Sequence, residues 1–134
     1  MTELAKRAVA CKHWRWMPGM LGLSAKAGPW RVERADLTAL CGAGAGPASI
    51  HEVGVWLPDL SDPATLGCLL ALVREAWGCH VHLRRWASPA PDMSGRDRST
   101  WEPVDGLGRR LVAGPRVLCD TEAEALVAAL EAAP

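Results

Sequence analysis

The chain has 134 residues, 15 basic against 15 acidic, and 49% of its residues are hydrophobic. This length and composition fit one folded domain, residues 1–134, and exclude intrinsic disorder. Non-specific nucleic-acid binding needs a basic surplus that the chain lacks, and no apolar run approaches the roughly 20 residues of a membrane helix. Since the N-terminus also lacks the apolar core of a signal peptide, we expect a cytoplasmic protein.

Three segments place apolar residues at helical spacing: residues 2–11, 62–77 and 121–134. In the second segment, Asp62 can cap the helix, Pro63 suits the first helical position and Gly78 suits the residue after the helix. The third segment opens with Thr121 and Glu124, which have the spacing of a capping box. We therefore predict three helices, of which the central one packs against a sheet.

The intervening segments have the pattern of strands, at residues 30–34, 53–57, 79–86, 100–104, 109–112 and 116–119. The third alternates cleanly, with Val81 and Leu83 on one face and His82 and Arg84 on the other. Residues 88–99 are predicted to be an exposed loop and the Gly-rich residues 42–48 a connection. The sequence thus predicts an α+β fold, a single-domain helix–sheet–helix sandwich with a mainly antiparallel sheet and the order α-β-β-α-β-β(-β)-α.

Two segments are candidate binding surfaces because each combines arginine with tryptophan, which is the only aromatic residue type in the chain apart from histidine. In the first, Arg15 and Trp16 precede Pro18; the guanidinium could hold a phosphate and the ring could stack on a base. The second is the polar face of the predicted strand, formed by His80, His82, Arg84 and Trp86. Each segment also has a purely structural interpretation. Trp14 or Trp16 could pack in the core, and the polar face of the strand could simply be solvated.

Catalytic chemistry has little support in the sequence. The glycines at 42–46 lack the flanking strand and helix of a nucleotide-binding loop, and the cysteines and histidines lack the paired spacing of a zinc site. We therefore expect no cofactor, no bound metal and no catalytic residue. A small metal- or cysteine-dependent hydrolase that uses Cys79, His80 or His82 remains the enzymatic alternative.

Three segments resemble small uncharacterised proteins of bacteriophages, prophages and mobile elements of GC-rich bacteria: AVACKHWRWMPGM, LPDLSDPATLGCLLALVREAWG and TEAEALVAALEAAP. Together they make up 49 of the 134 residues and span the exit of the first predicted helix, the central helix and the last helix. The layout is similar, more loosely, to the phage ABA sandwich domain, in which helices flank a small sheet. The resemblance implies an accessory gene on a mobile element and supports the sandwich fold, and it names no reaction.

These observations lead to one expected function and two alternatives. We expect a non-enzymatic accessory protein that binds a host protein or a small anionic, nucleotide-like ligand, without membrane contact, and that could form a homo-oligomer. The alternatives are the hydrolase and a structural component of a virion.

Overall fold

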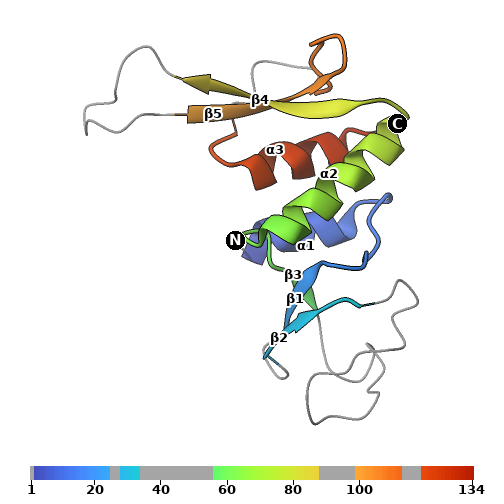
Figure 1. The fold of residues 1–134 in the computed structure, drawn as a ribbon, viewed down its shortest axis with the longest axis vertical. Coiled ribbons are helices and arrows are strands. Elements are labelled where there is room, and N and C mark those ends of the chain that lie inside the picture. The colour runs from blue at the N-terminus through green and yellow to red at the C-terminus, as the bar shows by residue number, and fades with distance from the viewer. Residues whose placement is uncertain (1, 25–27, 34–55, 88–98, 113–118) are drawn as a thin grey trace. The chain divides into compact units, whose positions relative to one another are not determined.

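The computed structural model describes residues 2–24, 28–33, 56–87, 99–112 and 119–134 (Figure 1). In chain order the elements are α1 (Thr2–Ala10), β1 (Leu21–Ser24), β2 (Gly28–Arg31), β3 (Leu57–Pro58), α2 (Pro63–Trp77), β4 (Val81–Ala87), β5 (Ser99–Asp105) and α3 (Glu122–Glu131). The three helices among these residues and the antiparallel pairing of the strands confirm the predicted α+β class and element order. None of the described helices is long and apolar enough to cross a membrane.

The chain divides into two compact units, residues 1–68 and 69–134, with the boundary inside α2. The described strands form two sheets, β2-β1-β3 in the first unit and β4-β5 in the second, whereas the sequence analysis expected one. In the first sheet β1 pairs with the adjacent β2, as when Ser24 pairs with Gly28, and also with the distant β3, where Gly22 pairs with Pro58. The expectation of a single domain stays a prediction.

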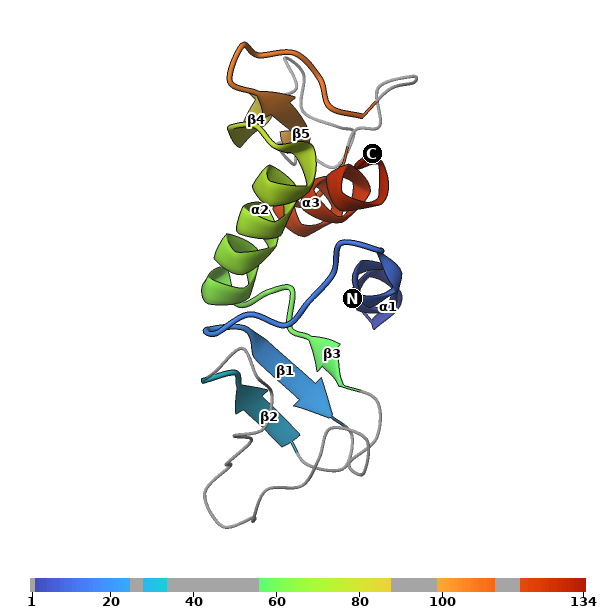
Figure 2. The same ribbon diagram turned by 90° about the vertical axis from the view of Figure 1, so that its right-hand side faces the viewer.

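The first unit is organised around a strand that the sequence analysis did not predict. Strand β1 pairs with both β2 and β3, and α1 contacts β3 (Figure 2). Gly22 lies in its middle because two indole rings occupy the space of a side chain: a Cβ there would come within 3.3 Å of both Trp16 and Trp56. A four-residue strand interrupted by glycine gives no alternating signal, which explains why the segment was missed.

The strands predicted at 30–34 and 53–57 are shifted in the structure. Strand β2 begins at Gly28 and ends at Arg31, and the following Val32 is buried without being in a strand. Residues 53–55 lie outside the described residues, and Leu57 opens the two-residue β3.

The start of α2 is fixed by a polar network. As predicted for a helix cap, Asp62 Oδ2 accepts from the backbone N–H of Thr65, at 2.8 Å, and from its hydroxyl, at 2.9 Å. The Thr65 hydroxyl in turn accepts from the N–H of Leu21 in β1, at 2.8 Å. Arg31 in β2 donates to both carboxylate oxygens, at 2.9 and 3.2 Å. These bonds, together with those from Thr65, outweigh the effect of burial and lower the pKa of Asp62 from 3.8 to about 2. One carboxylate thus joins the helix start to two strands.

In the second unit, α3 lies along the β4–β5 ribbon and contacts β5 (Figure 1). The capping box is confirmed in part: the Thr121 side chain accepts from the Glu124 N–H at 3.2 Å, while the Glu124 carboxylate accepts from the N–H of Asp120. The indole N–H of Trp77, the last residue of α2, donates to the carbonyl of Ala129 at 2.9 Å. The core of the second unit is apolar, and its buried side chains include Val104 from β5 and Leu126 from α3.

The strand predicted at 109–112 is wrong: of these residues only Arg110 makes a bridge, an isolated one with Val104, where the turn after β5 returns the chain along that strand. In the segment predicted at 116–119, Cys119 makes an isolated bridge with Trp101. Residues 116–118 lie outside the described residues, as do the predicted connection 42–48 and, except for Ser99, the predicted loop 88–99.

Candidate functional site

A carboxylate on β5 brings together side chains that the sequence analysis had placed on one strand face. The register pairs Arg84 with Glu102, and Glu102 is 8% exposed. Arg84 Nη2 donates to Glu102 Oε2 at 2.8 Å, and the indole N–H of Trp86 donates to the same oxygen at 3.0 Å. The carboxylate therefore fixes the orientation of both neighbours.

Arg84 and Trp86 also contact each other directly. The guanidinium carbon of Arg84 lies 4.7 Å from the centroid of the Trp86 ring, which is a cation–π arrangement. Trp86 is 39% exposed, although a ring of this size is usually more buried. The Arg84 Nε is buried and donates no hydrogen bond within the part of the chain that the structure describes.

A second guanidinium approaches the same carboxylate from the segment after β5. Arg110 Nε lies 3.5 Å from Glu102 Oε1, and the Arg110 side chain is 41% exposed. Burial by itself would raise the pKa of Glu102, but the bonds from Arg84 and Trp86 outweigh it, and the pKa lies below its ordinary value. Glu102 is therefore ionised at neutral pH, and its single negative charge faces two guanidinium groups.

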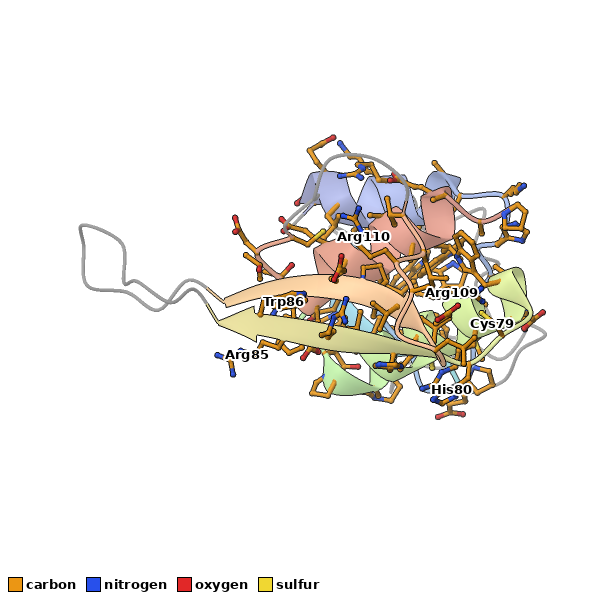
Figure 3. The ribbon with its side chains drawn as sticks, turned by 90° about the horizontal axis from the view of Figure 1, so that it is seen from above. Cys79, His80, Arg85, Trp86, Arg109 and Arg110 are labelled. Atoms are coloured by element: carbon orange, nitrogen blue, oxygen red, sulfur yellow. The ribbon has the colours of Figure 1, made fainter. Side chains whose placement is uncertain are left out.

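The surroundings of Glu102 include a small pocket. Its lining comes from β5, the following segment and α3: Glu102, Pro103, Arg110, Val112, Cys119 and Ala128. We call the surface formed by Arg84, Trp86, Glu102 and Arg110 the Arg–Trp face. Figure 3 shows Trp86 toward the end of β4, Arg110 on the β5 side and Arg85 extending from the opposite edge.

The two predicted histidines lie toward the other end of the ribbon. His82 is exposed and shares the strand face of Arg84 by alternation, whereas His80 precedes the first residue of β4. Their ring centroids are 6.3 Å apart. His80 lies beside Cys79, away from Trp86 (Figure 3). Of the four residues predicted on this strand, the structure joins Arg84 and Trp86 by direct contact.

The other two predicted site residues belong to the first unit. Arg15 is exposed, and Trp16 is half-buried, in edge-to-face contact with Trp14 at 5.7 Å and against Gly22. Their different environments are those expected of neighbours in an extended chain, whose side chains point to opposite sides. That Arg15 contacts a ligand stays a prediction.

Sequence analysis missed Glu102 and Arg110. It explained carboxylates only as helix caps, whereas Glu102 lies in mid-strand opposite Arg84. Its partners follow from the pairing register of β4 and β5, which residues 88–98 separate in sequence. A two-residue turn would have set that register, but a long connection leaves it open.

Among the described residues, those of the enzymatic alternative do not form a metal centre. No three of the described His, Cys, Asp and Glu side chains are grouped closely enough to hold a metal ion. Cys79 is exposed, while burial raises the pKa of the Cys68 thiol and disfavours its nucleophilic thiolate form.

Comparison with known proteins adds no assignment to this geometry. No protein-family model, no curated protein and no solved structure matches the chain. Its function is therefore inferred from its own residues.

Proposed function

We propose that the chain is a non-enzymatic binding protein whose Arg–Trp face binds a small anionic ligand of nucleotide chemistry. The observation that carries this proposal is the contact of Arg84 with both Glu102 and Trp86. These contacts hold the Arg84 guanidinium beside the Trp86 ring, at a surface where Trp86 is 39% exposed. Nucleotides combine an anionic phosphate with a planar base, which are the groups that such a pair attracts.

Charge around Glu102 supports the anionic character of the ligand. Arg84 and Arg110 both lie within 4 Å of this carboxylate, at 2.8 and 3.5 Å, so the three described groups together carry a formal charge of about +1. Their side chains are 38% and 41% exposed, so each is accessible in part to a ligand at this surface. Such a contact would be a charge-assisted hydrogen bond.

The arrangement also lowers the cost of binding. A free arginine or tryptophan loses rotamer freedom when a ligand fixes it, by about 0.5–1.5 kcal/mol for each side chain. Here Glu102 already fixes both, through Arg84 Nη2 and the Trp86 indole N–H. The base would pack on the exposed part of the ring and the phosphate would lie next to the guanidinium groups.

The accessory role belongs to the same proposal. It rests on the resemblance of three segments to proteins of phages and mobile elements, and action in the cytoplasm of a host cell follows from that origin. Two alternatives would use surfaces other than the Arg–Trp face. In one, the chain binds a host protein; in the other, it contacts other subunits of a virion.

Isothermal titration calorimetry with ADP, adenosine and pyrophosphate tests the proposal. ADP supplies both groups, so it should bind more tightly than adenosine, which lacks phosphate, and more tightly than pyrophosphate, which lacks the base. Equal affinities for ADP and pyrophosphate would remove the stacking role of Trp86. Absence of ADP binding at millimolar concentration would contradict the proposal.

Variants assign the binding to the face. Arg84→Gln should weaken ADP binding at least tenfold, since a charge-assisted bond is worth about 1.5–3 kcal/mol. Trp86→Leu should weaken it at least about fivefold, since base stacking is worth about 1–3 kcal/mol. Lys12→Gln, which removes an exposed cation in the other unit, is the matched control and should leave the affinity unchanged. Thermal melts of each variant separate lost binding from lost folding.

A further inference from the structure

The turn that follows β5 presents the most exposed large apolar side chain among the described residues. Leu107 is 80% exposed, and it lies between Asp105, the last residue of β5, and Arg109. We call residues 105–109 the Leu107 turn. A single exposed leucine is common on protein surfaces, so the argument depends on what holds this one and what surrounds it.

Hydrogen bonds converge on Asp105 and hold the turn in one conformation. Its Oδ1 accepts from the N–H groups of Leu107, at 2.9 Å, and Arg109, at 2.8 Å. Its Oδ2 accepts from Arg109 Nε at 2.7 Å, and its carbonyl accepts from the N–H of Gly108 at 2.9 Å. Gly108 has a φ of +77°, which glycine adopts without the steric cost of a side chain.

The turn is also packed against the start of β4. A Cβ at Gly106 would lie 3.7 Å from the Cβ of His80 and 3.8 Å from its carbonyl oxygen. The tip therefore rests on the backbone before β4, which limits its motion as a unit. Leu107 is exposed on a support that is already ordered, so burying it in a partner costs little additional entropy.

The charge exposed beside Leu107 is positive. The Arg109 side chain is 74% exposed, whereas that of Asp105, its partner in the turn, is 11% exposed. Arg110 follows directly, with 41% of its side chain exposed. Figure 3 shows Arg109, Cys79 and His80 near the same end of the ribbon. A partner thus meets an apolar tip with guanidinium groups on one flank.

We propose that the Leu107 turn is a protein-docking tip, which inserts Leu107 into an apolar socket with an acidic rim on a partner protein. Charge selects this partner over a second copy of the chain, because a symmetric contact through Leu107 would bring the Arg109 side chains of both copies together. The proposal does not depend on nucleotide binding, since Leu107 makes no contact with Arg84, Trp86 or Glu102 among the described interactions.

Photo-crosslinking followed by binding measurement tests this proposal. A benzophenone amino acid replaces Leu107 or, as the matched control, Leu23, which is 43% exposed on β1. Mass spectrometry of cells that naturally make the chain should identify one protein crosslinked from position 107 and not from position 23, with the crosslink in a segment rich in acidic residues. That protein is then purified and titrated with the chain.

The titration decides between docking and incidental proximity. Leu107→Ser should raise Kd for the purified partner at least tenfold, Leu23→Ser should leave it within twofold, and Leu107→Ser should not change the affinity for ADP. Higher salt should weaken the protein contact as the Arg109 charge is screened. The proposal is overturned if position 107 crosslinks to no protein, if it crosslinks only to a second copy, or if Leu107→Ser binds like the unaltered chain.

Discussion

Replacing Asp62 by asparagine should reduce the change in the free energy of unfolding between pH 7 and pH 2. Asparagine is as good a helix cap as aspartate, so the bonds from Thr65 can persist, while the charge that pairs with Arg31 is lost. The substitution thus isolates the ion pair from the cap.

The size of the effect is bounded by the pKa of Asp62, which hydrogen bonds from Arg31 and, to a smaller extent, from Thr65 lower from 3.8 to about 2, so the ion pair accounts for only part of the shift. At about 1.4 kcal/mol per pH unit, this difference corresponds to at most about 2.5 kcal/mol. The Arg31 side chain is 48% exposed, and solvent screens an interaction of this kind, so we expect about 1 kcal/mol. Because the folded-state pKa is the lower one, this stabilisation is fully present above pH 4 to 5 and disappears as the pH falls through about 2.

The assay is urea unfolding of the unaltered chain and of Asp62→Asn at several pH values between 2 and 7. The two free energies of unfolding should differ by about 1 kcal/mol at pH 6 and approach each other as the pH falls to 2. The control is Asp59→Asn, because the Asp59 carboxylate accepts from the amide and hydroxyl of Ser61 rather than from an arginine. A difference for Asp62→Asn that is the same at pH 2 and pH 6 would refute the reasoning.

Two further predictions concern packing in each unit. Leu69→Ala should lower the free energy of unfolding by about 2–5 kcal/mol, because Leu69 is fully buried in α2 and truncation leaves a cavity; a loss below about 1 kcal/mol in urea melts would mean that α2 does not face a core. Gly22→Ala should lower the free energy of unfolding, because the added methyl group would lie 3.3 Å from both Trp16 and Trp56 and the two rings hold each other in place; the same melts check it. An unchanged midpoint for Gly22→Ala would mean that the rings do not pack on β1.

The parts of the fold that sequence predicted well are those determined by neighbouring residues. The helices at 63–77 and 122–131 combine apolar spacing with local caps at Asp62 and Thr121, and both begin at the predicted cap. The alternation of β4 is equally local, since Val81 is buried and His82 exposed as predicted. Such signals need no knowledge of distant contacts.

The parts that sequence did not predict depend on residues far apart in the chain. Gly22 is in a strand because Trp56, 34 positions later, packs on it, and the split into two sheets depends on which strands meet. The candidate site shows the same limit: Arg84 and Trp86 were predicted from strand alternation, but Glu102 joins them only through the β4–β5 register.

The central claim, that the Arg–Trp face binds a nucleotide, is tested most directly by nuclear magnetic resonance of the indole N–H groups. The chain has seven tryptophans and therefore seven indole signals, which can be followed individually during a titration with ADP. The account predicts that the Trp86 signal shifts in a saturable way, because its N–H is bonded to Glu102 within the face, while the Trp30 signal in the other unit does not. Saturation accompanied by a shift at Trp30 and none at Trp86 would contradict the account, and so would seven signals that all remain in place.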